Sequence, residues 1–303
     1  KHWSPSSPVA VVVSAMGNQT DQLVALAKDL GASDGPAYDT IIAAGEQIST
    51  GAMALALQEL GLKAAPLQGW QLPITTSDTH SKARILSISL EPLKSMMDQG
   101  IIPVIAGFQG ITPQGLITTF GRGGSDLTAV AVAAALKADQ CILYKDVPGV
   151  LNADPRIIEG AQLQEQISYD EMIELSGLGS KVIQSRAVEM AAIQGVPLQV
   201  LPTNQKGPGS AIGDSFQLNE KENIRGVVVN GQETKITLVH APISIAIKAQ
   251  LFDCLAKSNI SIDMIIQHGP GDGDQFDDLS FTACSSDAKK AMDLCEFIKE
   301  KLG

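Results

Sequence analysis

Short apolar runs that do not alternate with polar residues recur along the first part of the chain. They cover Pro8–Ser14, Ile101–Phe108, Gln140–Asp146 and Val196–Leu201. Continuous runs of this length, rich in β-branched residues, are typical of strands that are buried on both faces of a parallel sheet. The pattern therefore predicts four core strands.

Longer segments with a helical pattern separate these runs. The predicted helices are Asp21–Leu30, Tyr38–Leu60, Leu90–Gln99, Ser125–Lys137, Tyr169–Gly177 and Ser180–Gln194. Alternation of buried strands with helices indicates an α/β domain in which helices cover both faces of one open sheet. We place this domain at residues 1–203.

The pattern changes after residue 203. Residues 204–223 are rich in glycine, polar and charged residues, which predicts a linker. Residues 224–303 mix strand-like and helical segments, which indicates a second, small α+β domain. Its predicted strands are Ile224–Asn230, Thr234–His240, Ile260–His268 and Leu279–Cys284, and its predicted helices are Ile243–Lys257 and Asp287–Lys301.

Composition and charge narrow the classes of function. The 303 residues include 22 Lys and Arg against 33 Asp and Glu, a net charge of −11. Phosphate backbones favour positive surfaces, so nucleic acid is not an expected partner. No apolar run reaches the roughly 18 residues that span a bilayer, and the opening "KHWSPSSP" does not resemble a signal peptide. We expect a cytoplasmic protein that does not bind membranes.

The four cysteines do not indicate a metal site. Cys141, Cys254, Cys284 and Cys295 show neither CxxC spacing nor a histidine-rich neighbourhood. Such cysteines are expected to be reduced thiols rather than zinc ligands or disulfides.

The stretch "GRGGSD", residues 121–126, opens a helix that has almost no polar face. Glycines let a backbone approach a ligand closely, and a helix amino terminus offers unpaired N–H groups and partial positive charge. Arg122 can donate two hydrogen bonds to a carboxylate or phosphate. Ser125 or Asp126 is expected to cap the helix. The alternative to a ligand site is a plain glycine turn before a capped core helix.

Small and polar residues also follow the other predicted strands. Ser14 and Thr20 follow the first strand, Phe108 ends the second, and Lys145 and Asp146 end the third. Ligands of open α/β sheets bind at the carboxyl ends of strands. The sequence therefore predicts one ligand site at this edge of the sheet.

Glu46 is a single carboxylate in an otherwise apolar helix, within "AAGEQIS". A glutamate in such a setting either has an ionic partner or serves a ligand. The local sequence leaves both interpretations open.

Six segments together resemble one family. "VVVSAMGNQTD", "AAGEQIS", "IAGFQG", "TTFGRGGSDLTAVAVAAALKAD", "DVPGV" with "ADPR", and "ISYDEMIELSGLGSKVI" occur in the order found in aspartokinases of the amino acid kinase fold. The resemblance implies a three-layer, open, mainly parallel sheet, followed by an ACT-like regulatory domain at residues 224–303. It also implies a homodimer formed through the ACT-like domains.

The implied activity is transfer of the γ-phosphoryl group of ATP, with Mg²⁺, to the side-chain carboxylate of L-aspartate. The product, 4-phospho-L-aspartate, leads to lysine, threonine and methionine. By resemblance, the catalytic residues are Arg122, Asp126 and Lys181. The substrate-binding residues are Ser14, Thr20, Glu46, Phe108, Arg122, Gly123, Gly124 and Ser125, and the nucleotide-binding residues are Ser14, Lys145, Asp146, Leu151, Arg156, Ser180 and Lys181.

The chain departs from the family pattern in several places. The expected first strand with Lys-Phe-Gly-Gly does not precede the "VAVVVSAM" run, and a second ACT unit does not follow. Lys145 stands where the family has Thr or Ser, and Leu151 where it has Tyr. The loop "HAPISIAIK" replaces the usual Asp-Lys-Pro-Gly turn of an ACT domain.

These departures keep two other functions open. One is a non-catalytic relative that binds aspartate as a sensor or regulatory subunit without turnover. The other is a different acyl-phosphate-forming kinase of the same fold.

Overall fold

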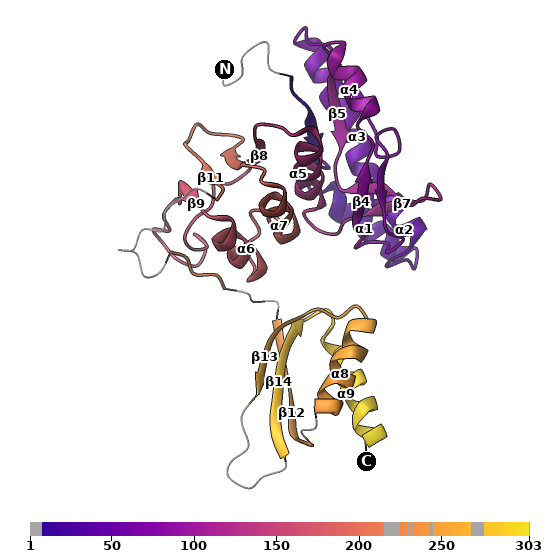
Figure 1. The fold of residues 1–303 in the computed structure, drawn as a ribbon, viewed down its shortest axis with the longest axis vertical. Coiled ribbons are helices and arrows are strands. Elements are labelled where there is room, and N and C mark those ends of the chain that lie inside the picture. Colours follow the sequence, from indigo (N-terminus) through magenta and orange to yellow (C-terminus); the bar gives the residue numbers. More distant parts are fainter. Residues whose placement is uncertain are drawn as a thin grey trace. The chain divides into compact units, whose positions relative to one another are not determined.

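The structure, a computed structural model, describes residues 8–214, 225–229, 231, 233–242, 245–267 and 276–302. The chain forms two compact units, Lys1–Val228 and Val229–Gly303. Figure 1 labels their helices and strands.

The first unit is built on a parallel sheet with the strand order β1-β5-β2. The strands are β1 (Val11–Val13), β5 (Ile102–Ala106) and β2 (Ala64–Leu67). Val104, Ile105 and Ala106 of β5 are fully buried, as the continuous apolar pattern predicts. Helix α3 (Ala44–Glu59) packs on both β2 and β5.

A second sheet of this unit has the order β8-β10-β11-β9. Strands β8 (Cys141–Lys145) and β10 (Leu198–Pro202) are parallel, whereas β11 (Ser210–Ile212) runs antiparallel to β10 and parallel to β9 (Gln166–Ile167). The α/β class is therefore confirmed, with the predicted core strands divided between two hydrogen-bonded sheets.

A small third sheet was not predicted from the sequence. It joins β3 (Ile74–Thr76), β4 (Ile85–Ile88), β6 (Gln109–Ile111) and β7 (Ile117–Thr119) in the order β4-β3-β6-β7. Phe108 adopts φ +68° between β5 and β6, which turns the chain from one sheet into the next. Strands this short carry too little pattern to be recognised.

The remaining helices of the first unit follow the predicted ones, with two differences. Residues 38–60 were predicted as one helix, but α2 ends before Ala43 and α3 begins after it. The helix predicted from Ser180 begins only at Ser185. The helices are α1 (Gln19–Asp29), α2 (Pro36–Ile42), α4 (Glu91–Asp98), α5 (Gly124–Leu136), α6 (Tyr169–Gly177) and α7 (Ser185–Gln194).

One segment of the described chain, Pro36–Glu59, is long and apolar enough to cross a membrane by length and composition. In this fold it forms α2 and α3, and its carboxylates Asp39 and Glu46 are 0% and 2% exposed inside the first unit. The segment is therefore a pair of core helices.

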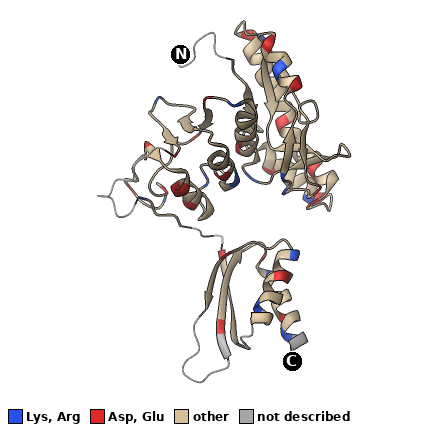
Figure 2. Ribbon diagram, viewed as in Figure 1, with Lys and Arg blue, Asp and Glu red and all other residues tan. Residues whose placement is uncertain are grey.

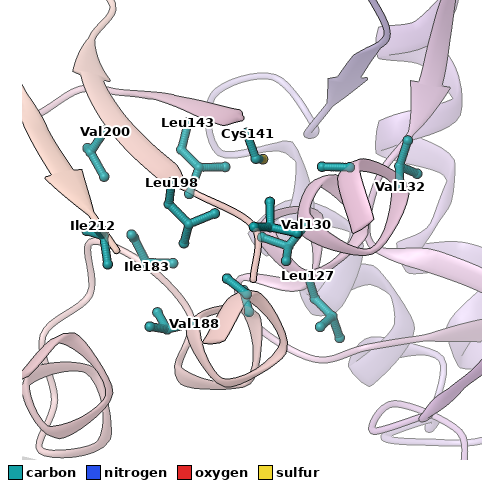
Figure 3. Packing of buried hydrophobic residues seen from close by; sticks show 14 of the residues in the cluster. Leu127, Val130, Val132, Cys141, Leu143, Ile183, Val188, Leu198, Val200 and Ile212 are labelled. Atoms are coloured by element: carbon teal, nitrogen blue, oxygen red, sulfur yellow. The ribbon is translucent and has the colours of Figure 1, made fainter. Parts of the chain in front are cut away.

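Helix α5 lies at the centre of the main core. Leu127, Val130 and Val132 are at most 3% exposed, and Figure 3 shows them in the same buried cluster as Leu198 of β10. The helix is tan along nearly all its length in Figure 2, because only its first turn carries a charge. Burial on all sides holds its amino terminus rigidly, as the apolar sequence predicts.

The second unit is an antiparallel sheet with the order β12-β14-β13. Phe281 is fully buried in a separate core and meets Phe252 edge-on, with ring centroids 6.3 Å apart. The elements are β12 (Glu233–Pro242), α8 (Ile245–Lys257), β13 (Ile262–Gln267), β14 (Phe276–Cys284) and α9 (Ala288–Leu302).

Two predictions around the boundary differ from the structure. Residues 225–229 of the predicted strand Ile224–Asn230 are not a strand. Ser210–Ile212, within the predicted linker, forms β11 of the first unit. The linker residues 215–223, Ile224, Asn230 and His268 lie outside the described residues.

Candidate active site at the amino terminus of helix α5

The turn before α5 depends on its two glycines. Gly123 is the residue before the helix and adopts φ 75°, a left-handed conformation that costs other residues energy. A Cβ on Gly124 would lie 2.9 Å from side-chain atoms of both Phe108 and Phe120. Neither position therefore has room for a side chain, and the Gly124 N–H itself donates to the Gly121 carbonyl at 3.0 Å.

The prediction that Ser125 or Asp126 caps α5 is wrong. The helix has no side-chain cap, and both side chains contact other elements instead. The hydroxyl of Ser125 donates a hydrogen bond to Ser14 Oγ, at 3.0 Å. Ser14 follows β1, so this bond joins the start of α5 to the carboxyl end of a strand.

The next residue, Ala15, joins the same place to α3. Its N–H donates to Glu46 Oε1 at 3.0 Å, and a Cβ on Gly45 would lie 2.7 Å from Ala15 Cβ. A Cβ on Gly107, after β5, would lie 2.8 Å from Ser125 Cβ. The starts of α3 and α5 therefore pack closely against the residues that follow β1 and β5.

Glu46 has one carboxylate oxygen that the fold does not use. Oε2 is buried and has no hydrogen-bond partner within the described part of the chain. Burial raises the pKa of Glu46 to about 7, although the Ala15 N–H opposes this shift. A buried acceptor left in this state is suited to a cationic group of a ligand.

Asp126 is held by a cation from the second sheet. Lys145 Nζ, at the end of β8, lies 2.7 Å and 2.9 Å from the two oxygens of Asp126, and the side chains are 24% and 10% exposed. The backbone N–H of Gln184 donates to the same carboxylate at 3.3 Å. The site therefore contains a positive charge fixed against the first turn of α5.

Gln184 was not predicted as a site residue. Besides contacting Asp126, its side-chain amide donates to the carbonyl of Arg122 at 3.0 Å. It precedes α7, far from Arg122 in the sequence, so no local pattern distinguishes it from a surface glutamine.

Arg122 extends into solvent. Its guanidinium lies 3.2 Å from Asp21 Oδ1, and the two side chains are 91% and 66% exposed. Asp21 and the half-buried Thr20 share the first turn of α1. An exposed pair of this kind is weak, so the guanidinium is available to a ligand.

The predicted nucleotide-binding residues form a second group. Arg156 donates from Nε and Nη2 to Asp154 at 3.0 Å and 2.7 Å, and this lowers the pKa of Asp154 to about 2. Lys181 is exposed in the turn between α6 and α7, next to Ser180. Its positive charge also lowers the pKa of Asp154, so Lys181 lies near the pair of Asp154 and Arg156. Leu151 forms a bridge with Leu163.

The structure therefore places the predicted residues in two groups. The first group lies at or around the first turn of α5 and consists of Ser14, Glu46, Phe108, Gly124, Ser125, Asp126 and Lys145. The second group consists of Arg156 and Lys181, which both act on the carboxylate of Asp154. Thr20 and Arg122 lie at the exposed rim through Asp21. Asp146 is exposed beyond β8.

Comparison with known proteins identifies the family of the chain. The sequence profile of the amino acid kinase family matches residues 1–202. Aspartokinase 2 of Bacillus subtilis is 42% identical over 297 residues, which cover 97% of this chain and 72% of that protein.

Two solved structures give the same result. Aspartate kinase from Synechocystis has a TM-score of 0.60 and 37% identity, covering 96% of this chain and 49% of that chain. Aspartokinase III of E. coli, in complex with aspartate and ADP, has a TM-score of 0.71 and 25% identity, covering 88% of this chain and 59% of that chain. The chain thus spans between about half and three quarters of these relatives, and it belongs to the aspartokinases of the amino acid kinase family.

Proposed function

We propose that the protein transfers the γ-phosphoryl group of ATP to the side-chain carboxylate of L-aspartate, giving 4-phospho-L-aspartate and ADP. One observation carries this proposal. The dipeptide Ser14-Ala15 brings an unsatisfied buried carboxylate oxygen, on Glu46, next to the anion-binding start of α5. A small amino acid with acidic groups has the complementary charges.

In this arrangement Glu46 Oε2 accepts hydrogen bonds from the substrate ammonium. The backbone N–H groups of Gly123 and Ser125, together with the Arg122 guanidinium, bind the substrate carboxylates. Gly124, whose N–H donates to the Gly121 carbonyl, leaves the space that a side chain would fill. Ser14, Thr20 and Phe108 form the remaining wall. The E. coli relative was crystallised with aspartate and ADP, which supports the same pair of ligands.

The reaction needs charge stabilisation more than a base. The aspartate side chain has a reference pKa of about 3.9, so it is already ionised and can attack the γ-phosphorus. The new O–P bond forms as the bond from the γ-phosphorus to the β-phosphate bridging oxygen breaks, and ADP leaves with the electron pair. Cations must offset the repulsion between two anions, and we assign this task to Lys145, held by Asp126, and to Lys181.

The second group of residues is assigned to ATP. Its other members lie in the segment between Lys145, at the end of β8, and Lys181, before α7: they are Asp146, Leu151, Arg156 and Ser180. Arg156 would bind phosphate by exchanging its exposed bonds to Asp154 for bonds to the nucleotide.

Mg²⁺ is proposed to arrive with ATP. The described residues contain no group of three or more His, Cys, Asp or Glu that could hold a metal ion by itself, so their chemistry fits an ion carried mainly by phosphate oxygens. Asp146, exposed beyond β8, would offer one carboxylate oxygen to the ion. The ion would neutralise charge on the transferred phosphoryl group.

Trapping of the acyl phosphate tests this function. Purified protein is incubated with Mg-ATP, L-aspartate and hydroxylamine, and aspartyl hydroxamate is measured beside the Arg122→Ala variant. Hydroxamate that disappears in the variant supports the proposal. Aspartate binding by calorimetry without any hydroxamate would instead indicate a non-catalytic sensor, and product from another acid in a substrate panel would indicate a different kinase of this fold.

A homodimer formed by the second unit is proposed on the family resemblance. Val239, Met264 and Ile265 of this unit are 69%, 50% and 54% exposed, so its sheet carries apolar surface that a second copy could cover. Sedimentation velocity of the protein and of Met264→Asp tests this assembly.

A further inference from the structure

Asp39 is a fully buried carboxylate that the proposed reaction does not use. It lies in α2, is 0% exposed, and accepts five hydrogen bonds from three residues. Oδ2 accepts from the Ser81 N–H at 3.0 Å, the Thr119 N–H at 3.1 Å and His80 Nδ1 at 2.9 Å. Oδ1 accepts from the hydroxyls of Thr119 and Ser81 at 2.7 Å and 3.2 Å. These donors use the full accepting capacity of a carboxylate.

The bonds join three segments that are distant in the sequence. Thr119 ends β7, whereas His80 and Ser81 belong to the loop between β3 and β4. That loop also contacts the end of β7 through its backbone, because the Ala83 N–H donates to the Thr119 carbonyl at 3.0 Å. Asp39 therefore fixes the loop and the end of β7 together.

The fixed strand end leads directly into the site. Phe120, Gly121 and Arg122 follow Thr119, and a Cβ on Gly121 would lie 3.2 Å from the Ser81 carbonyl oxygen. Arg186 bridges the same two segments, donating to the carbonyls of Phe120 and Ala83 at 3.2 Å and 2.8 Å. A shift of the loop would therefore move the backbone that carries Arg122 and the first N–H groups of α5.

The arrangement is costly in energy. Ser81 adopts φ 63°, which is unfavourable for a residue other than glycine, and both its N–H and its hydroxyl are spent on Asp39. His80 Nδ1 lies 2.9 Å from Asp39 Oδ2, and the His80 side chain is 14% exposed. A buried carboxylate whose oxygens are all hydrogen-bonded fixes the positions of its donors.

We propose that Asp39, oriented by His80, is a positioning residue that holds the Thr119–Arg122 segment and thereby sets the affinity of the α5 amino terminus for aspartate. The inference rests on the proposed function for the identity of the ligand. Asp39 and His80 do not contact the substrate in this proposal. They affect aspartate binding through Arg122 and the first turn of α5.

The test compares two substitutions of His80. His80→Leu removes the donor to Asp39, whereas His80→Asn keeps an N–H donor near the position of Nδ1. We expect His80→Leu to raise the KM and the Kd for aspartate by about fivefold or more, with the KM for ATP and kcat changed less than about twofold. His80→Asn should stay near wild type. Ser77→Ala, which removes the hydroxyl that binds the Arg84 N–H in the same loop, is the matched control and should change neither constant.

Thr119→Val provides a second, nearly isosteric variant that removes one donor to Oδ1 but keeps the backbone bond. It should also weaken aspartate binding selectively. Equal losses for aspartate and ATP, or unchanged aspartate affinity in both His80→Leu and Thr119→Val, would overturn the proposal.

A readout without turnover separates this inference from the proposed function. Hydrogen exchange of the Gly121–Ser125 amides should become faster in His80→Leu and Thr119→Val than in wild type and Ser77→Ala. Wild-type protein that forms no hydroxamate refutes the proposed reaction, whereas unchanged exchange in both variants refutes the positioning role.

Discussion

Glu46 is a buried acid whose protonation depends on its ligand. With a pKa raised to about 7 by burial, it is partly protonated near neutral pH, and its Oε2 has no partner within the described chain. A bound ammonium group favours the ionised form. Binding of aspartate and loss of a proton from Glu46 should therefore be coupled.

The first prediction concerns this coupling. The affinity for aspartate should rise as pH increases from about 6 to about 8, because the ionised form of Glu46 binds the ammonium group. Glu46→Gln should bind more weakly and show a flat profile over this range. Calorimetry in two buffers of different ionisation enthalpy would detect proton release on binding. A wild-type profile that is equally flat would contradict the assignment of Glu46.

The second prediction is that Glu46 makes the stability of the fold depend on pH. The ordinary pKa of 4.5 applies to the unfolded chain and about 7 to the folded one, so the unfolded state holds fewer protons between these values. The contribution of Glu46 to the free energy of unfolding is therefore fully present below pH 4.5, falls through this window, and has decreased by on the order of 3 kcal/mol above pH 7. Urea titrations of wild type and Glu46→Gln should diverge across the window; parallel curves would contradict the shift.

The pair of Lys145 and Asp126 gives the third prediction. Lys145→Met leaves the Asp126 carboxylate, 10% exposed, without its cation, so the free energy of unfolding should fall by about 1–3 kcal/mol. Phosphoryl transfer should slow by about tenfold or more because a fixed cation is lost. Lys145→Arg, which keeps the charge, is the control, and denaturant titration with hydroxamate rates measures both effects. Faster transfer in Lys145→Met would show that the lysine opposes the reaction.

Among elements, α5 was the most readable from the sequence. Its apolar run predicted a buried helix, and the structure places it at residues 124–136 with Leu127 and Val130 inside the core. The capping prediction failed because it considered only local side chains. Ser125 and Asp126 find partners on β1 and β8, which the sequence does not place beside them.

The fourth prediction tests the turn before α5. Gly123→Ala should destabilise the fold by about 1–2 kcal/mol through its positive φ and should also weaken aspartate binding, since a Cβ would lie 2.9 Å from Gln184 Cβ. Gly100→Ala is the matched control, because it has φ 69° with no atom within 4 Å of its Cβ. The unfolding temperature should fall by a similar amount in both variants. Calorimetry should show weaker aspartate binding only in Gly123→Ala. Equal binding would exclude a role of this turn.

The short strands and the helix boundary at Ala43 could not be predicted from the hydrophobic pattern of the sequence. Strands β3, β6 and β7 have three residues each, and their partners are chosen by the reversal at Phe108. Ala43 itself is fully buried and apolar, so nothing in its sequence context indicates that one helix ends there and the next begins.

At the scale of the whole molecule, the two units have separate cores. Leu198 belongs to the main core of the first unit, and Phe281 to the core of the second, and the two clusters share no residue. Each unit therefore has the buried apolar surface that cooperative folding requires.

The fifth prediction follows from these separate cores. Phe281→Ala should lower the stability of the second unit by about 3–5 kcal/mol and leave aspartate binding unchanged. Leu198→Ala should instead lower the stability of the first unit by about 2–5 kcal/mol and leave that of the second unit unchanged. Hydrogen exchange resolved by segment distinguishes the two units. Loss of protection throughout the chain in either variant would show that the units fold as one.

The sequence by itself determined the α/β class, the four core strands, and the buried helix α5 with the glycine turn before it. Periodicity and glycine chemistry are local properties, so a linear pattern carries them. Only the tertiary structure decided which side chains meet: Lys145 with Asp126, Ala15 with Glu46, and Asp39 with Thr119. These contacts join residues that are distant along the chain, and they exist only once strands and helices have packed into register.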